Sequence, residues 1–206
     1  MSARRIKSIS EVPARQRLIE AALALIVENG GCRGVNLRQI AARAGCAHTN
    51  VYNYFDSLEE LFWAAMVHAI DFQLGELAEQ IRSPAAARDP LRHFITAQVS
   101  LAQSHPTLYR LCWLEPLDGP APAGVLERFG GMRQYWERFV GARFAALRSR
   151  TDPEWARQII HGYFHGELCK LIGRQAFLPP SDDDRHRIVA NTLALIDLVA
   201  TAKSPP

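Results

Sequence analysis

The stretch NLRQIAARAGCAHTNVYNYF, residues 36–55, contains two short apolar stripes on either side of Gly45. The stripes consist of Leu37, Ile40, Ala41 and Ala44 before the glycine, and of Ala47, Val51 and Phe55 after it. Each spacing is typical of one face of a helix. Glycine readily takes the positive φ that closes a tight turn between two helices. The stretch therefore predicts a helix-turn-helix, for which an ordinary helical hairpin is the alternative.

The side chains of the second helix that lie off its apolar stripe are polar and carry no negative charge. They are His48, Thr49, Asn50, Tyr52 and Asn53. Hydrogen-bonding groups of this kind suit a helix that enters the major groove of DNA. This surface is therefore a candidate nucleic-acid interface.

Positive charge is concentrated near the N-terminal end of the 206-residue chain. Residues 1–56 hold eight Lys/Arg and four Asp/Glu, whereas the remaining residues hold sixteen and seventeen. This distribution is typical of nucleic-acid binding, although a solvated face has the same composition. Residues 1–12 carry Arg4, Arg5 and Lys7 without any periodicity. We expect either a basic arm that touches DNA or a disordered tail, with the tail favoured.

Composition and motifs argue against several other classes of protein. With 48% hydrophobic and 22% charged residues, the chain is typical of a soluble globular protein. We find no signal peptide or transmembrane segment, and Cys32, Cys46, Cys112 and Cys169 lack a CxxC spacing. Reduced thiols and a cytoplasmic location are expected. The GxSxG, HExxH, P-loop and Rossmann patterns are also missing from the sequence, so we expect neither enzymatic activity nor a cofactor.

Periodicity and capping signals divide the chain into about nine helices and no strands. Asn36 is a good N-cap for the helix before the turn, and Ser57 with Glu60 forms a capping box that opens a helix to about residue 81. Its buried side is expected to comprise Leu58, Leu61, Phe62, Ala65, Ala69, Phe72 and Leu77. Other helices are expected over about 13–29, 90–104, 106–115, 125–147, 153–175 and 182–202. We predict an all-α fold with an N-terminal three-helix DNA-binding domain over residues 1–56 and a larger helical domain over residues 57–206.

The N-terminal sequence resembles the TetR-type transcriptional repressors. The matching segments are RLIEAALALIVENG at 17–30, LRQIA at 37–41, Ala44-Gly45, Val51-Tyr52-x-Tyr54-Phe55 and Glu59-Glu60-Leu61-Phe62. The agreement in residue type and spacing covers about 50 residues. A weaker match is His161-Gly162-Tyr163, which resembles the penultimate helix of many members.

The resemblance implies a homodimer that binds a palindromic operator and is released by a small-molecule effector. The DNA-binding residues it implies are Asn36, Arg38, Ala47, His48, Thr49, Asn50, Tyr52, Asn53 and Tyr54. Of the base-edge candidates, Asn50 is the best suited to a bidentate contact with adenine. Tyr52 and Tyr54 stand where the family places phosphate contacts, unless their rings pack beneath Phe55.

Two positions depart from the family pattern. Thr49 stands where the family commonly has glycine, and Leu58 where it commonly has lysine. Thr49 adds a side chain that can read a base, so we expect an operator preference of this chain's own. Leu58 removes a phosphate contact, which flattens the salt slope by about 0.9 in log–log terms. The salt dependence should therefore be shallow unless the N-terminal arm compensates.

Two further sets of residues are candidates for the effector pocket and the dimer interface. The pocket candidates are the aromatic residues Trp63, Phe94, Tyr109, Trp113, Trp136 and Phe139, with Glu115, Arg133 and Arg138 as polar anchors. The interface candidates are Gly162, Gly166, Leu195 and Leu198, because small residues let a partner helix approach closely. Ordinary packing within one chain is the alternative for both sets.

His161, His165 and Cys169 recur every four residues on one expected helix. This row is ligand-like for zinc, but the sequence specifies no fourth ligand, and we expect no metal. A helical metal-binding protein or enzyme that uses His161 and His165 is the alternative from another class. A DNA-binding regulator that responds to no ligand is the third possibility.

Overall fold

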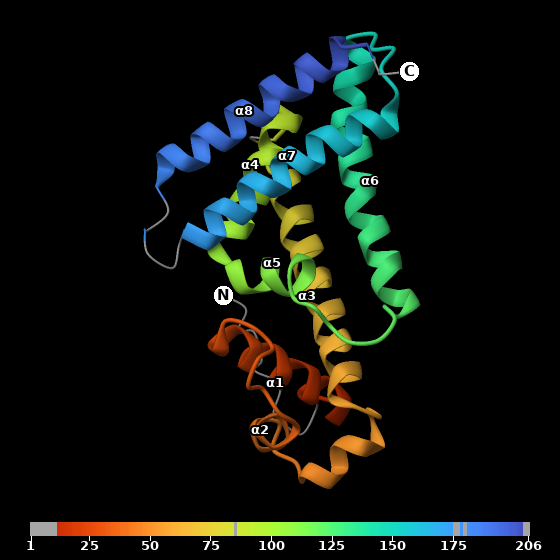
Figure 1. Ribbon diagram of the computed structural model, residues 1–206, viewed down its shortest axis with the longest axis vertical. Coiled ribbons are helices and arrows are strands. Elements are labelled where there is room, and N and C mark those ends of the chain that lie inside the picture. The colour runs from red at the N-terminus through yellow and green to blue at the C-terminus, as the bar shows by residue number, and fades with distance from the viewer. Residues whose placement is uncertain (1–11, 85, 175–177, 179–180, 204–206) are drawn as a thin grey trace, which may run out of the picture. The chain divides into compact units, whose positions relative to one another are not determined.

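The computed structural model describes residues 12–84, 86–174, 178 and 181–203. Within these residues every regular element is a helix, which confirms the all-α prediction. The elements are α1 (Ala14–Asn29), α2 (Leu37–Arg43), η2 (His48–Asn53, a 3-10 helix), α3 (Leu58–Ile81), α4 (Pro90–Ser104), α5 (Pro106–Trp113), α6 (Ala123–Ala146), α7 (Pro153–Arg174) and α8 (Asp182–Thr201), as labelled in Figure 1. No described helix is long and apolar enough to cross a membrane.

The helix ends follow from local chemistry. α1 ends at Gly30, whose φ of 72° lets the amides of Gly30 and Gly31 reach the carbonyls of Val27 and Ile26. α2 begins with a reciprocal capping box, because Asn36 Oδ1 accepts from the Gln39 amide at 3.1 Å. Gln39 Oε1 in turn accepts from the Asn36 amide at 3.0 Å. These two ends frame the loop that leads into the helix-turn-helix.

The start of α3 differs in one detail from the predicted capping box. Ser57 Oγ accepts from the Glu60 amide at 3.1 Å, as expected. The Glu60 carboxylate, however, accepts from the amide of Asp56 at 2.7 Å, one residue before the cap. This bond joins the end of the helix-turn-helix to the first turn of α3.

The buried side of α3 agrees with the prediction except at a few positions. Leu61 is completely buried, but Phe72 is 38% exposed and Leu58 is only half-buried. The Phe72 ring instead lies edge-on to His105, with centroids 5.0 Å apart. Met66 and Ile70, which the prediction omitted, are both buried.

The chain forms two compact units. The first comprises residues 1–71 and 107–128, and the second comprises residues 72–106 and 129–206. The chain therefore passes between the units within α3, at the start of α5 and within α6. A functional boundary at residues 56 and 57 remains a prediction.

Each unit has its own apolar core. In the first unit, Leu18, Ile26, Ile40, Val51 and Phe55 are buried and hold α1, α2 and η2 together. In the second unit, α8 packs along α7 and α4. Its largest buried side chains are Phe94, Ile95, Ile160, Leu168 and Ile188.

Candidate nucleic-acid interface and effector cavity

The helix-turn-helix is built as its apolar stripes predict. Ile40 and Val51 are completely buried, so α2 and η2 share one core. Gly45 takes a φ of 69° between them, a backbone conformation that other residues adopt rarely. The second element, η2, is a 3-10 helix of six residues that begins after Ala47 without a side-chain cap. It presents its remaining side chains outward.

The polar residues of η2 are available to a partner. Tyr52 is 53% exposed, and Thr49 and Asn53 are also exposed. Asn53 Nδ2 donates to Asn50 Oδ1 at 2.7 Å, which orients the Asn50 amide while leaving its own NH2 donors for another acceptor. His48 lies edge-on to the Tyr52 ring, with centroids 5.7 Å apart. The Asn50 side chain is therefore held in one orientation and still has NH2 hydrogens to donate to a partner.

The other predicted DNA-binding residues lie before and after η2 in the sequence. Tyr54 is 38% exposed, so its ring is not covered by the core beneath Phe55. Ala47 is exposed and precedes η2, and Asn36 is exposed while it caps α2. Arg38 is exposed and forms no ion pair with any residue that the structure describes.

Several of the N-terminal cations are bound to the fold itself. Arg17 donates to the carbonyls of Ala44 at 3.2 Å and Val12 at 2.7 Å. The Arg15 guanidinium lies 4.9 Å from the centre of the Phe55 ring. Arg43 forms a bidentate pair with Glu28 at 2.5 Å, and this bond lowers the pKa of Glu28.

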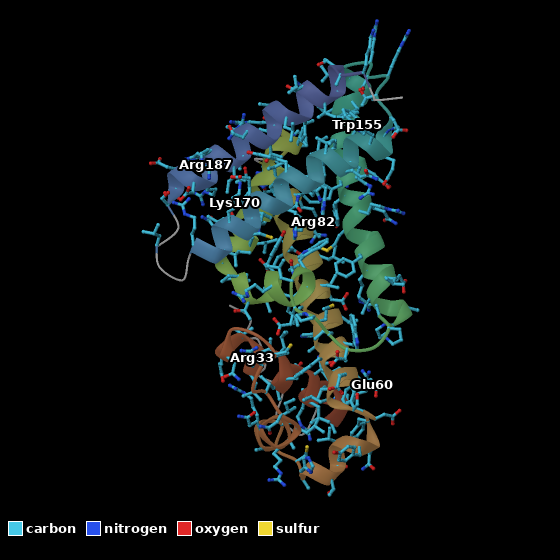
Figure 2. All side chains as sticks on the ribbon, viewed as in Figure 1. Arg33, Glu60, Arg82, Trp155, Lys170 and Arg187 are labelled. Carbon is cyan, nitrogen blue, oxygen red and sulfur yellow. The ribbon has the colours of Figure 1, made fainter. Side chains whose placement is uncertain are left out.

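Fewer cations in residues 1–56 are therefore available to contact phosphate than the charge excess of this segment suggests. Arg33, labelled in Figure 2 on the loop after α1, and Arg38 remain unpaired among the described residues. Arg4, Arg5 and Lys7 lie outside the described residues. The contacts of Arg15 with Phe55, Arg17 with Ala44 and Arg43 with Glu28 join residues far apart in sequence, so composition carries no signal for them.

The six aromatic residues predicted for an effector pocket divide between the two units. Trp63, Tyr109 and Trp113 lie in the first, and Phe94, Trp136 and Phe139 lie in the second. Phe94 is completely buried and stacks on Phe139 at 4.8 Å, with Trp136 edge-on at 5.4 Å. The structure thus brings three of the six together as core packing.

A cavity of about 390 Å³ lies between α6 and α7 in the second unit. Its lining is mainly apolar and consists of Arg133, Trp136, Glu137, Val140, Gly141, Phe144, Pro153, Glu154, Ala156, Arg157 and Ile160. Trp136 and Arg133 were predicted for an effector pocket, whereas the aliphatic wall was not. Arg133 pairs with Glu137 at 3.3 Å. Arg157 pairs with Glu154, and this hydrogen bond is the main cause that lowers the pKa of Glu154 to about 2.

The residues predicted for a dimer interface share the outer faces of α7 and α8. Leu198 is 67% exposed and Leu195 is half-buried. A Cβ added at Gly162 or Gly166 would meet no atom within 4 Å. Ile159, also on α7, is 41% exposed. Leu198 and Ile159 thus expose apolar side chains, and both glycines have open space where a Cβ would lie.

The histidine row on α7 is spread along the helix. The rings of His161 and His165 are parallel with centroids 6.0 Å apart, and His165 Nε2 lies 3.4 Å from Cys169 Sγ. Burial lowers the pKa of both imidazoles, and for His161 the neighbouring His165 and Arg157 add to this effect. Among the described residues, no three His, Cys, Asp or Glu side chains are grouped as a metal site.

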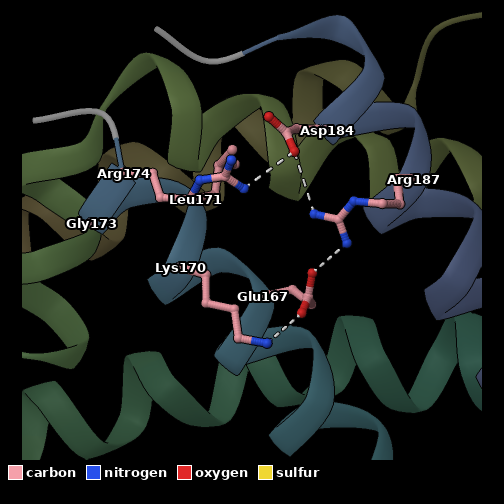
Figure 3. A pocket seen from close by; sticks show the side chains of 7 residues that line it. All are labelled: Glu167, Lys170, Leu171, Gly173, Arg174, Asp184 and Arg187. Carbon is pink, nitrogen blue, oxygen red and sulfur yellow. Dashed lines mark hydrogen bonds and ion pairs between the residues drawn. The ribbon is translucent and has the colours of Figure 1, made fainter. Parts of the chain in front are cut away.

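A second set of charges, which sequence reasoning did not predict, joins α7 to α8. Glu167 is 7% exposed and accepts from Lys170 and Arg187, each at 2.8 Å. Arg187 and Arg174 also face Asp184, at 3.4 and 3.7 Å (Figure 3). The hydrogen bonds from Lys170 and Arg187 lower the pKa of Glu167.

Comparisons with known proteins agree with this architecture. Residues 18–65 match the family model described as bacterial regulatory proteins, tetR family. The HTH-type transcriptional regulator RutR of Escherichia coli K12 is 30% identical over 122 residues, which are 59% of this chain and 57% of RutR. The chain thus spans less than two thirds of the length of this curated relative.

Two solved structures share the fold over nearly the whole chain. FadR of Bacillus subtilis, solved in complex with stearoyl-CoA, has a TM-score of 0.65 at 20% identity. The alignment covers 90% of this chain and 97% of the FadR chain. A protein of unknown function from Rhodococcus sp. RHA1 has a TM-score of 0.74 at 20% identity, with coverage of 95% and 100%. Residues 18–65 therefore match the tetR family of bacterial regulatory proteins, and the chain as a whole shares the fold of these two solved structures.

Proposed function

We propose that the chain is a repressor that binds a palindromic operator as a homodimer and leaves it when a small-molecule effector binds. The observation that carries this proposal is η2, which presents Thr49, Asn50 and Asn53 from a buried framework of α1 and α2. Backbone contacts position such an element and base contacts give it sequence preference. The family model covers the same segment.

The DNA-binding part of the proposal can be tested by selection from a random pool of duplexes with the full chain. We expect a palindrome whose half-sites are about one helical turn apart, 34–36 Å, because a two-fold dimer presents two copies of η2. A pool that yields no palindrome would contradict the proposal.

The outer faces of α7 and α8 support the dimer. Leu198 on α8 is 67% exposed and Gly162 and Gly166 on α7 are uncrowded, and exposed apolar surface of this kind favours association. We expect Leu198→Asp to shift the mass measured by light scattering from dimer to monomer. Leu126, on α6 and 63% exposed, provides the matched control, since Leu126→Asp should leave the mass unchanged.

The cavity between α6 and α7 supports an effector with a largely apolar body. Its volume of about 390 Å³ lies in the range of small-molecule sites, and Trp136, Val140 and Phe144 form much of its wall. FadR of Bacillus subtilis was solved with stearoyl-CoA, so that molecule is a rational first probe for release of the selected operator. Val140→Trp should fill the cavity and abolish release while operator binding remains. Release that persists in this variant would place the effector elsewhere.

A further inference from the structure

Residues 114–128, which we call the strap, connect α5 to the first turns of α6. The strap belongs to the first unit together with the helix-turn-helix. Residues 72–106 and 129–206, which flank the whole segment 107–128, belong to the second. The segment 107–128, which contains the strap, is therefore a part of the first unit whose two ends are joined covalently to the second.

Two side-chain contacts hold the strap against α3. Trp63 Nε1 donates to the carbonyl of Asp118 at 3.0 Å. Arg128 Nε donates to Asp71 Oδ1 at 2.7 Å, and its Nη1 donates to the carbonyl of Gly124 at 3.1 Å. These bonds anchor both the middle and the end of the strap on one helix.

A third contact reaches the loop between α1 and α2. Glu115 Oε1 accepts from the Cys32 amide at 2.9 Å. A Cβ added at Gly31 would lie 3.3–3.4 Å from the two Glu115 carboxylate oxygens, so the carboxylate sits directly over this loop. Burial first, and then the Glu115 carboxylate, raise the pKa of the Cys32 thiol to about 12. The hydrogen bond, the short distance to Gly31 and the raised pKa of Cys32 all indicate that the Glu115 carboxylate lies close to this loop.

We propose that Glu115 is a positioning residue for the helix-turn-helix. Its carboxylate fixes the loop that ends at the cap of α2, and α2 packs against both α1 and η2. A hydrogen bond to a carboxylate is stronger than one between neutral groups, so a single bond can order a short loop. A conformational change in the second unit that displaces the strap would break the bond between Glu115 and the Cys32 amide. The loop would then be free to move, and the placement of η2 would change. This consequence rests on the proposed function.

The contact itself is tested without DNA, by amide hydrogen exchange and by pH-dependent alkylation of Cys32. In Glu115→Ala we expect the Cys32 amide to exchange about tenfold faster, because a hydrogen bond to a charged group is lost. The thiol should also react at lower pH. Asp118→Ala is the matched control, since only the backbone carbonyl of Asp118 is used. Unchanged exchange and alkylation in Glu115→Ala would overturn the proposal.

Two milder variants keep the test independent of folding defects. Glu115→Gln retains an acceptor but removes the charge, so thiol reactivity should rise more than amide exchange does. Gly31→Ala retains the charge but pushes the carboxylate by a few tenths of an ångström, and Gly31 is not in the left-handed region. Cys32 exchange should rise in both, and wild-type protection in both would overturn the proposal.

The positioning role is tested with the operator selected for the wild-type chain. We expect Glu115→Ala to weaken binding about five- to tenfold at an unchanged melting temperature of the second unit, and Asp118→Ala to bind as the wild type does. Faster Cys32 exchange with wild-type affinity would overturn the positioning role and leave the proposed function intact. A wild-type chain that binds no operator would contradict the proposed function and the positioning role together, while the Cys32 measurements would still report on the contact.

Discussion

The polar side chains of η2 and those between α7 and α8 are bonded in opposite ways. On η2, Thr49 and Tyr52 are exposed, and the side-chain amide of Asn53 donates to that of Asn50. Between α7 and α8, the buried Glu167 accepts from two cations. Polar groups that are satisfied within a chain stabilise it, whereas exposed groups with spare donors are available to a partner. Mutations at the two places should therefore change different measurements.

The largest expected effect is on operator binding. Asn50→Ala should weaken binding of the selected operator about 10- to 100-fold, because a bidentate amide–base contact is worth roughly 1–3 kcal/mol. The melting temperature should not change, since the bond from Asn53 lies at the surface. Isothermal titration with operators altered one base pair at a time measures the effect.

The loss at Asn50 should be confined to one base position in each half-site. Gln134→Ala, which removes an exposed amide from α6, is the control and should bind as the wild type does. Equal weakening at every operator position would identify Asn50 as a backbone contact and contradict base reading.

The next effect is on stability. Glu167→Ala should lower the free energy of unfolding by about 1–2 kcal/mol, because two hydrogen bonds to a buried carboxylate are lost. The lower end is expected, since Lys170 and Arg187 are exposed enough to be hydrated afterwards. Denaturant unfolding measures the change, and operator affinity should be unaffected below the transition.

Glu79 provides the matched control for Glu167. It pairs with Arg82 three residues on, and both side chains are largely exposed. Glu79→Ala should produce no measurable change in stability, because exposed pairs contribute little. A loss as large as that of Glu167→Ala would show that burial is not what distinguishes the two glutamates.

A smaller effect is the pH dependence of the same carboxylate. The pKa of Glu167 is lowered from its ordinary 4.5 by Lys170 and Arg187, so its contribution is present above pH 4.5 and is lost as pH falls through the lowered value. His161 and His165, whose pKa values are also lowered, reduce stability from pH 6.5 downwards. The Glu167 contribution is therefore read as the difference between the wild type and Glu167→Gln.

This difference should be constant above about pH 5 and shrink on acidification. Urea unfolding at half-unit pH intervals gives the curve for both proteins. A difference that grows as pH falls would show that Glu167 is destabilised, rather than stabilised, as an anion.

Several helix starts could be predicted from the sequence because they depend on neighbouring residues. Asn36 and Ser57 cap the helices that follow them, as expected, and Asp89 caps α4 in the same way. The orientation of Phe72 could not be predicted in this way. α3 passes from one unit to the other at this residue, and periodicity does not reveal where a helix changes its neighbours.

The functional residues were predictable only where their chemical type is distinctive. The amide and hydroxyl side chains after the turn identify η2 as a candidate interface in the sequence. Val140 and Ile160, which line the cavity, cannot be distinguished in the sequence from ordinary core residues. Glu115 was considered as an anchor in the effector pocket, whereas its carboxylate binds the Cys32 amide in the first unit. Contacts between residues this distant in sequence leave no local pattern.

The smallest expected effect separates two arginines only five residues apart. Arg38→Gln should reduce the slope of log affinity against log salt by about 0.9, the value of one phosphate contact, because Arg38 is exposed and unpaired among the described residues. Arg43→Gln should leave the slope unchanged, since Glu28 already neutralises Arg43. Operator affinity measured over a salt series tests both, and removal of residues 1–9 in the same series measures the contribution of Arg4, Arg5 and Lys7. An equal decrease in slope for Arg43→Gln would mean that the pair with Glu28 opens on DNA, and the distinction between bonded and available side chains would then fail within the helix-turn-helix itself.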